Sequence, residues 1–501
     1  MNNKLKNSWI LLLLLAVSIS CSKDDDDINN PDPGTVELNN EVNDFIWKGM
    51  NYWYYYQDKV EDLADTKDDN QDNYYTYLNK YSDPEDLFDD LVYAQEDDFS
   101  WYIEDVEAQA DAFRGISESY GINLGFAVYI DDTQTDVVVY VGYVTENSPA
   151  SDAGIQRGDL IYSVDGTTLN GNNVNLINKL FTESSISLGF VEIVGGEFIY
   201  DENEIALSPV ILNENPVHYH DIIETAGSKI GYLVYNSFVH TYHEELNDVF
   251  AEFKNENINE LVLDLRYNGG GSVITSAFLA SMIHGGANSN ATFANLVYNQ
   301  KRDSRQGATY PFFDQAWIYD KTTGAYIDGG DIDINRLGSL NRVYVITTGY
   351  TASASEMIIN GLRPYMEVIV VGSTTVGKNE GSITVYDSQG DFTNPEERNP
   401  NHNIGMQPIV FQITNSEGQS DYDNGFTADL EIEEGNFAAS IKPFGDPSEA
   451  LLAKAINDIT GVSARQSLLS TITLEKAVKI KGPKFSTEMY MLPSDLQLLE
   501  K

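Results

Sequence analysis

The chain has 501 residues, enough for about three domains of ordinary size. Its 30 basic and 78 acidic residues give a formal net charge of −48, which excludes nucleic-acid binding through a basic surface. The 42% hydrophobic content excludes wholesale disorder, and a single cysteine excludes a disulfide framework or a multi-cysteine zinc site.

An export signal is predicted for residues 1–20. A lysine-containing start precedes an apolar run at 9–17, which is too short to span a bilayer. Small residues then lead to Cys21, and this stretch resembles the lipobox of bacterial lipoproteins, although Ser18 stands where an aliphatic residue is usual. An ordinary cleaved signal peptide with a leftover thiol is the alternative.

The residues after Cys21 predict a flexible acidic tether over 21–39, rich in Asp, Asn and Pro. The sequence SKDDDD at 22–27 resembles the acidic export tag of surface lipoproteins of gram-negative bacteria. These resemblances imply a lipid anchor on Cys21 in the outer membrane. The protein would face the periplasm or the outside, and the acidic residues favour the outside.

A small helical domain is predicted over residues 40–115. Apolar residues recur at three- to four-residue spacing between 42 and 50, and Ser-Asp-Pro-Glu at 82–85 is typical of a helix start. The aromatic cluster at 53–56 is interpreted as a packing seam rather than a ligand site.

Short strands are predicted over residues 116–208, where β-branched and aromatic runs alternate with Gly and Asn-Gly turns. From 209 to 460, buried apolar runs alternate with helical stretches, which indicates α/β layers with parallel strands. Residues 285–340 read as a long polar insertion, and the tail at 461–501 has no predicted role. The predicted strands are 126–130, 137–141, 160–164, 190–194, 261–265, 343–347 and 368–371.

A glycine-rich turn at 266–271 (RYNGGG) follows the strand at 261–265. Three consecutive glycines let backbone amides point outward, where they can hold a phosphate or an oxyanion. No Gly-Lys-Ser/Thr follows, so a phosphate loop is disfavoured.

A second candidate segment, GYTASASE at 349–356, places small residues around a serine at a predicted helix start. This setting leaves a hydroxyl accessible and puts the Ala354 amide at the positive end of the helix, as a nucleophile requires. The alternative is that Ser355 or Thr351 simply caps the helix.

The candidate base is Lys378, which follows the apolar strand at 368–371 and adjoins Gly377. A lysine acts as a base where desolvation lowers its pKa from about 10.4, and the alternative is a solvated surface lysine. The histidines lack a comparable small-residue frame and are interpreted as surface or structural residues: His218, His220, His240, His243, His284 and His402.

Taken in order, the segments 264–271 (DLRYNGGG), 351–356 (TASASE) and 372–378 (GSTTVGK) resemble the motifs of the C-terminal processing peptidases, or tail-specific proteases. Members of that family use a Ser–Lys dyad on a fold related to the crotonase and Clp protease folds. In the family pattern the middle serine is the nucleophile and the lysine follows 25 residues later, which selects Ser353 with Lys378.

The resemblance also implies the remaining catalytic parts. The oxyanion would be held by the amide of Ala354 and by one from the glycine turn, for which Gly270 is favoured over Gly271. No metal or organic cofactor is implied. The glutamine that commonly orients the lysine is replaced by Ser382, so Ser382 or Thr384 is only a weak candidate for that role. The NGFTAD motif at 424–429 is interpreted as structural.

The region 116–208 is similar to a PDZ domain, through Leu124-Gly125-Phe126, NSPA at 147–150 and AGIQRGDLI at 153–161. In that resemblance Leu124, Gly125 and Phe126 present amides to the terminal carboxylate of a polypeptide that adds as a β-strand. The region 40–115 resembles the N-terminal bundle of the family.

The expected architecture is therefore a multidomain α/β protein with a crotonase/Clp-protease-like catalytic domain at 209–460, an inserted PDZ module and an N-terminal helical bundle. The expected function is a serine endopeptidase that cleaves exported polypeptides chosen by their C-terminal tails. The competing hypothesis is a non-catalytic peptide-binding surface lipoprotein. A weaker one is an acyl-CoA enzyme on the same fold, against which the strong negative charge argues.

Overall fold

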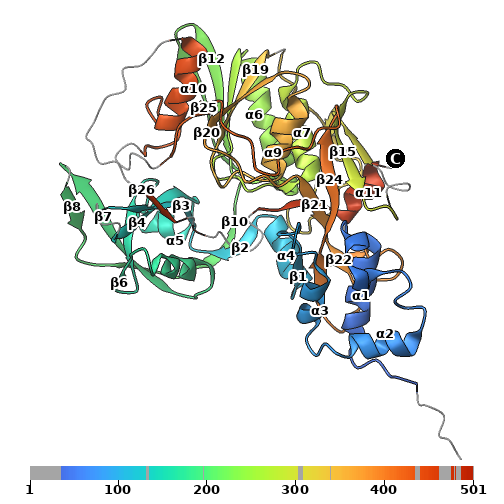
Figure 1. Ribbon diagram of the computed structural model, residues 1–501. Helices are drawn as coiled ribbons and strands as arrows, with labels where there is room; N and C mark the ends of the chain where they lie inside the picture. The colour runs from blue at the N-terminus through green and yellow to red at the C-terminus, as the bar shows by residue number, and fades with distance from the viewer. Residues whose placement is uncertain are drawn as a thin grey trace, which may run out of the picture.

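The computed structural model has α/β layers, a β-rich module and N-terminal helices (Figure 1). Cys21, the predicted signal and most of the predicted tether lie outside the described residues. No helix within the part of the chain that is described is long and apolar enough to cross a membrane. The structure describes residues 35–130, 135–195, 197–302, 308–338, 340–434, 441–461, 475–478, 480 and 487–499.

Short helices with side-chain caps form the N-terminal region. The Asn40 side chain caps α1, and Asp83 caps α3 with Pro84 in the first turn. Each helix buries one apolar face. The elements are α1 (Glu41–Trp53), η1 (Gln57–Lys59), η2 (Glu61–Leu63), α2 (Gln71–Leu78), α3 (Pro84–Leu91), β1 (Trp101–Ile103) and α4 (Val106–Phe113).

The PDZ-like region is an eight-stranded sheet in the order β26-β3-β4-β5-β7-β8, in which β6 pairs with β5 and β9 pairs with β7. The antiparallel pair β2–β10 connects this sheet to the rest of the chain (Figure 1). Its elements are β2 (Ile116–Ser119), β3 (Ile122–Tyr129), β4 (Val137–Val144), α5 (Pro149–Asp152), β5 (Leu160–Val164), β6 (Thr167–Thr168), η3 (Val174–Phe181), β7 (Ile186–Val194), β8 (Glu197–Tyr200), β9 (Ile205–Leu207), β10 (Val210–Asn213) and β26 (Glu475–Val478).

The first sheet of the α/β region has the order β11-β12-β13-β19-β20-β25, parallel from β12 onward. Successive side chains along a strand point to opposite faces of the sheet. On β13, Leu263 therefore packs toward α7 and α9, whereas Val262 packs toward α10. The elements are β11 (Val217–Thr225), β12 (Ser228–Tyr235), η4 (His240–Tyr242), α6 (His243–Asn255), β13 (Glu260–Asp264), α7 (Val273–Ile283), β19 (Arg342–Thr347), α9 (Ala354–Leu362), β20 (Glu367–Gly372), β25 (Leu430–Glu431) and α10 (Ala450–Thr460).

A second six-stranded sheet, β14-β27-β21-β24-β15-β16, contains part of the predicted insertion and part of the C-terminal tail. The strands β15 and β16 belong to the region predicted as a polar insertion, and β15 pairs with β24. The remaining elements are β14 (Gly271–Ser272), β15 (Thr292–Tyr298), β16 (Ala308–Pro311), β17 (Gln315–Ala316), β18 (Ile332–Asp333), β21 (Glu380–Ile383), β22 (Val385–Tyr386), η5 (Pro395–Glu397), β23 (Gly405–Gln407), β24 (Ile409–Asn415), β27 (Met489–Met491) and α11 (Pro493–Leu499).

The N-terminal helices share one hydrophobic core with the α/β region, in which Ile46 and Trp53 of α1 join Leu263 of β13. Trp53 also donates its indole N–H to the carbonyl of Asp391, at 2.7 Å. The PDZ-like region instead has a core of its own around Ile161. The predicted helical domain at 40–115 is thus joined to the α/β region by a common core.

Candidate active site

The glycine turn after β13 lies directly against Ser353. Gly270 and Gly271 have φ of +119° and +134°, and a Cβ on Gly270 would stand 2.8 Å from the Oγ of Ser353. The Gly270 amide donates to the side chain of Asn268, at 2.8 Å, within the turn. The Gly271 amide donates to the backbone carbonyl of Glu488, at 2.5 Å. Of the two predicted oxyanion donors, the Gly270 amide is therefore bonded to a side chain within the turn, and only the Gly271 amide donates to a backbone carbonyl.

Ser353 lies at the entrance to α9 with φ 63° and ψ −118°, a backbone conformation that is costly for a residue with a side chain. It is completely buried, and its Oγ has no hydrogen-bond partner among the described residues. The neighbouring hydroxyls have other roles: Ser355 donates to the Asn268 carbonyl and Thr351 to that of Leu265. These hydroxyls fasten the glycine turn and do not cap α9.

Lys378 is completely buried, unlike a solvated surface lysine. Its Nζ donates to the carboxylate of Glu488 at 3.0 Å and to the carbonyl of Thr487 at 3.1 Å. It also lies 4.6 Å from the centre of the Phe99 ring, which comes from the N-terminal region. The tail and the N-terminal region therefore both reach this lysine.

Glu356 joins the two predicted catalytic residues through their backbones. Its Oε2 accepts the amide protons of Ser353 and Lys378, each at 2.8 Å, and its Oε1 accepts that of Gly377 at 2.7 Å. Burial raises the pKa of Glu356 to about 7, although these hydrogen bonds oppose the rise. One buried carboxyl group thus holds the serine and lysine segments side by side.

The residues suggested for orienting the lysine do not bond to it. Ser382 donates to the carbonyl of Met489 at 3.1 Å, and Thr384 donates to the side chain of Gln407 at 2.8 Å. The roles of Glu356 and Glu488 were not found from sequence. Glu356 is the last residue of the TASASE motif at 351–356, whereas no local sequence pattern distinguishes Glu488.

The predicted carboxylate-binding residues Leu124, Gly125 and Phe126 lie on β3, which borders the catalytic loop. The Phe126 ring stacks on that of Tyr350 at 4.7 Å, and the Tyr350 hydroxyl donates to the Gly125 carbonyl at 3.0 Å. A cavity of about 500 Å³ between the PDZ-like region and the glycine turn is lined by Leu124, Tyr350, Gly270 and Glu488, among others. The predicted carboxylate-binding segment and the glycine turn therefore line the same cavity.

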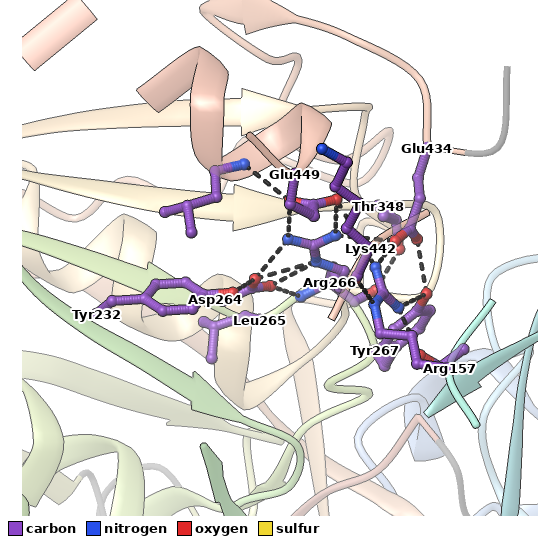
Figure 2. A network of polar contacts seen from close by, with 12 residues as sticks. Arg157, Tyr232, Asp264, Leu265, Arg266, Tyr267, Thr348, Glu434, Lys442 and Glu449 are labelled. Atoms are coloured by element: carbon purple, nitrogen blue, oxygen red, sulfur yellow. Dashed lines mark hydrogen bonds and ion pairs between the residues drawn. The ribbon is translucent and has the colours of Figure 1, made fainter. Parts of the chain in front are cut away.

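A buried polar network fixes the start of the glycine turn (Figure 2). Arg266 is completely buried and pairs with Asp264 at 2.6 Å and with Glu434 and Glu449 at 2.8 Å each. Arg157 of the PDZ-like region joins the same network through Glu434, at 2.7 Å.

The two guanidinium groups of this network stabilise the charged form of its buried carboxyl groups Glu434 and Glu449. Burial alone would raise the pKa of Glu434, but the guanidinium groups of Arg266 and Arg157 lower it to about 2. Arg157 also donates to the hydroxyl of Tyr267 at 2.8 Å, one residue before Asn268. The network therefore connects the PDZ-like region to the turn that carries Gly270 and Gly271.

The buried histidines have structural settings. Burial lowers the pKa of His240 to about 3 and that of His243 to about 4, and His243 bonds to the Trp317 carbonyl and the Thr275 hydroxyl. In the described ranges, no group of three or more His, Cys, Asp or Glu side chains could hold a metal ion.

The chain matches three protein-family descriptions. "Peptidase family S41" covers residues 229–408, "Peptidase S41 N-terminal domain" covers 41–101, and "PDZ domain" covers 140–175. The PDZ match begins after Phe126, so the proposed carboxylate-binding residues lie outside it.

Individual relatives agree with these matches. The chain is 23% identical over 345 residues to a "Probable CtpA-like serine protease" of Staphylococcus haemolyticus (strain JCSC1435), covering 67% of this chain and 61% of that protein. It is 24% identical over 297 residues to "Carboxyl-terminal-processing peptidase 2, chloroplastic" of Arabidopsis thaliana, covering 58% and 51%. The chain thus spans less than two thirds of these curated relatives.

A solved structure, "Putative S41 protease from Bacteroides fragilis NCTC 9343", aligns with a TM-score of 0.64 and 26% identity. The alignment covers 84% of this chain and 97% of that one. The expected crotonase/Clp-like multidomain fold and the family resemblance are confirmed by these matches together.

Proposed function

Because the chain belongs to peptidase family S41, we propose that it is a serine endopeptidase that cleaves exported polypeptides selected by their C-terminal tails. The observation that carries this proposal is the buried hydroxyl of Ser353, which has no partner among the described residues. The backbone amide of Ser353 shares the carboxyl group of Glu356 with that of Lys378.

In the proposed reaction, Lys378 in its neutral form takes the hydroxyl proton while the Oγ of Ser353 attacks the carbonyl carbon of the scissile bond. Backbone amides, those of Ala354 and Gly271, hold the oxyanion. Lys378 then gives the proton to the leaving amine. Water hydrolyses the acyl-enzyme and restores the serine.

The test compares Ser353→Ala with Ser355→Ala on an unstructured protein that ends in an apolar tail. We expect Ser353→Ala to reduce cleavage by at least about 10⁴-fold, since the nucleophile is lost. Ser355→Ala keeps measurable cleavage because its hydroxyl is not the reacting atom. Full activity of Ser353→Ala in a protease-free preparation would contradict the assignment.

The same assay distinguishes the non-catalytic alternative. If the wild-type protein binds the tail and neither it nor the variants cut, the protein is a peptide binder. A rate that rises toward alkaline pH is expected, because a lysine base must first lose its proton. An acidic optimum that survives Lys378→Ala would contradict the base assignment.

We further propose that Cys21 carries a lipid and tethers the protein to the outer membrane of a gram-negative bacterium. The support is its position after an apolar segment and before the acidic run at 22–27. Labelling with a palmitate analogue in cells is expected for the wild type and absent in Cys21→Ser. Equal labelling of both would contradict the proposal.

A further inference from the structure

A segment of the C-terminal tail, residues 487–491, fills the cleft between the two strands that carry the proposed site. Its strand β27 pairs in parallel with β14, Gly271 opposite Met489, and in parallel with β21, Ile383 opposite Met491. The strand β14 starts within the glycine turn, and β21 starts two residues after Lys378. The cleft between them thus accepts an extended peptide as an added strand.

Two of the proposed catalytic groups, Gly271 and Lys378, make hydrogen bonds to this segment. The backbone carbonyl of Glu488 accepts the hydrogen bond of the Gly271 amide. The space beside Gly270 is closed from two sides, because a Cβ placed on that glycine would lie 2.5 Å from the Glu488 carbonyl oxygen and 2.8 Å from the Ser353 Oγ. The Glu488 carboxylate and the Thr487 carbonyl accept the hydrogen bonds of Lys378. The tail therefore lies where a substrate peptide bond must lie.

The chemistry of these contacts opposes catalysis. The hydrogen bonds of the Lys378 Nζ go to the Glu488 carboxyl group and the Thr487 carbonyl, whereas a base must lie within hydrogen-bond reach of the hydroxyl whose proton it takes. Consistent with this, the Ser353 Oγ has no hydrogen-bond partner among the described residues. The arrangement binds a peptide without activating the nucleophile.

The segment is anchored on both sides. The Tyr490 ring stacks on that of Phe113 in α4 at 3.7 Å, and its hydroxyl donates to the Phe113 carbonyl at 3.1 Å. Asp495 of α11 is completely buried and accepts a hydrogen bond from Tyr319 at 2.6 Å. Met489 and Met491 are also buried.

An earlier part of the same tail occupies the predicted PDZ groove. The strand β26 pairs antiparallel with β3, Glu475 opposite Tyr129 and Val478 opposite Ala127 (Figure 1). Ile480 is buried in the core of the PDZ-like region. This is the pairing expected of a polypeptide that adds as a strand to a sheet edge.

The order of the two contacts argues against a substrate role for the tail. A substrate held by its free C-terminus in the PDZ groove has its scissile bond on the N-terminal side of that contact. Here the groove-bound residues 475–478 come before the cleft-bound residues 487–491.

We propose that residues 487–499 are an intramolecular inhibitor, which a polypeptide tail displaces when it competes for the edge of β3. This inference rests on the proposed function, because it assigns Ser353 and Lys378 as the groups that are blocked.

The test uses Glu488→Gln and Tyr490→Ala, which remove the pairing with Lys378 and the stacking on Phe113. Three quantities are measured: initial cleavage rate, the rate at which a fluorophosphonate labels Ser353, and hydrogen exchange at 270–272 and 487–491. We expect both rates and the exchange to rise about tenfold or more, because a charge-assisted hydrogen bond or a buried ring then no longer holds the closed state. A gain of activity cannot come from misfolding.

The matched controls are Tyr490→Phe, which keeps the stacked ring, and Glu396→Gln, an exposed carboxylate. Both are expected to stay within about twofold of wild type, since surface substitutions and a single neutral hydrogen bond have small effects.

Three results would overturn the inference. Unprotected amides at 487–491 in the wild type would mean that the cleft is not occupied. Lower cleavage in Glu488→Gln would make Glu488 a positioning residue for Lys378. Release of residues 489–501 by wild type but not by Ser353→Ala would make the tail a substrate. If exchange behaves as expected and no protein cleaves or labels, the proposed function fails while the occupancy stands.

Discussion

The N-terminal helices and the PDZ-like region are both attached to the catalytic body, but in different ways. Ile46 and Trp53 of α1 lie in the same hydrophobic core as the catalytic sheet. The PDZ-like region has its own core, and it meets the body through Arg157 and through the stacking of Phe126 on Tyr350. A shared apolar core makes two segments one folding unit, whereas a smaller contact between two separate cores permits relative motion. The N-terminal helices are therefore part of the same folding unit as the first sheet, whereas the PDZ-like region is built around a core of its own.

The largest expected effect separates these two attachments with a matched pair of substitutions. Ile46→Ala and Ile161→Ala each truncate a completely buried isoleucine, at a cost of about 2–5 kcal/mol. Ile46→Ala is expected to lower the unfolding midpoint of the catalytic body, because the core is shared. Ile161→Ala should affect only the PDZ-like region, as followed by hydrogen exchange during chemical denaturation. Equal loss at both sites in both variants would contradict the distinction.

A smaller effect is expected from Arg157→Met, which removes the buried link to Glu434 and Tyr267. The loss of charge-assisted hydrogen bonds should cost about 1.5–3 kcal/mol and raise hydrogen exchange at 267–271. The control is Arg342→Met, whose partly exposed pairing with Glu260 should be worth at most about 1 kcal/mol. No change at 267–271 in Arg157→Met would show that the network does not couple the two regions.

The smallest effect expected is a pH dependence of the docking of α11, which carries the buried Asp495, onto the rest of the protein. Burial raises the pKa of Asp495 from its ordinary value to about 7, although the hydrogen bond from Tyr319 opposes the rise. The nearby phenols of Tyr310 and Tyr490 stay neutral because burial raises their pKa values. Docking of α11 therefore takes up a proton. It weakens as pH rises from about 4 to about 7, by up to about tenfold per pH unit, and is constant above that range.

Hydrogen exchange at 487–499 measured from pH 5 to 8 checks this dependence after correction for the intrinsic exchange rate. Asp495→Asn should flatten it, whereas Asp248→Asn, at an exposed position on α6, should keep it. A wild-type profile without pH dependence would mean that the Asp495 carboxyl group stays protonated, or stays ionised, in both states.

Much of the fold could be predicted because its strands carry local patterns. The predicted strands 261–265 and 343–347 differ from β13 and β19 by one residue or less at each end. Buried parallel strands are continuous apolar runs, and such runs are visible without tertiary information. The roles of Ser353 and Lys378 stay predictions, although the structure places both side chains in the interior.

The parts that could not be predicted depend on contacts between distant segments. Nothing in the amphipathic pattern of α1 says which surface covers its apolar face, so the shared core was invisible. Glu488 lies in a weakly patterned tail, and its pairing with Lys378 spans 110 residues. Glu356 could have been suspected as the third residue of α9, but only the structure shows that it accepts amides from both catalytic segments.

The position of β27 has a consequence for biogenesis. This strand lies between β14 and β21, yet it follows them by more than 100 residues in the chain, so the second sheet cannot close until residue 491 has been synthesised. Pairing of such distant segments is slow to form. When the sheet closes, the same event places the Thr487 carbonyl on Lys378 and the Glu488 carbonyl on the Gly271 amide, so both contacts are made in the last step of folding.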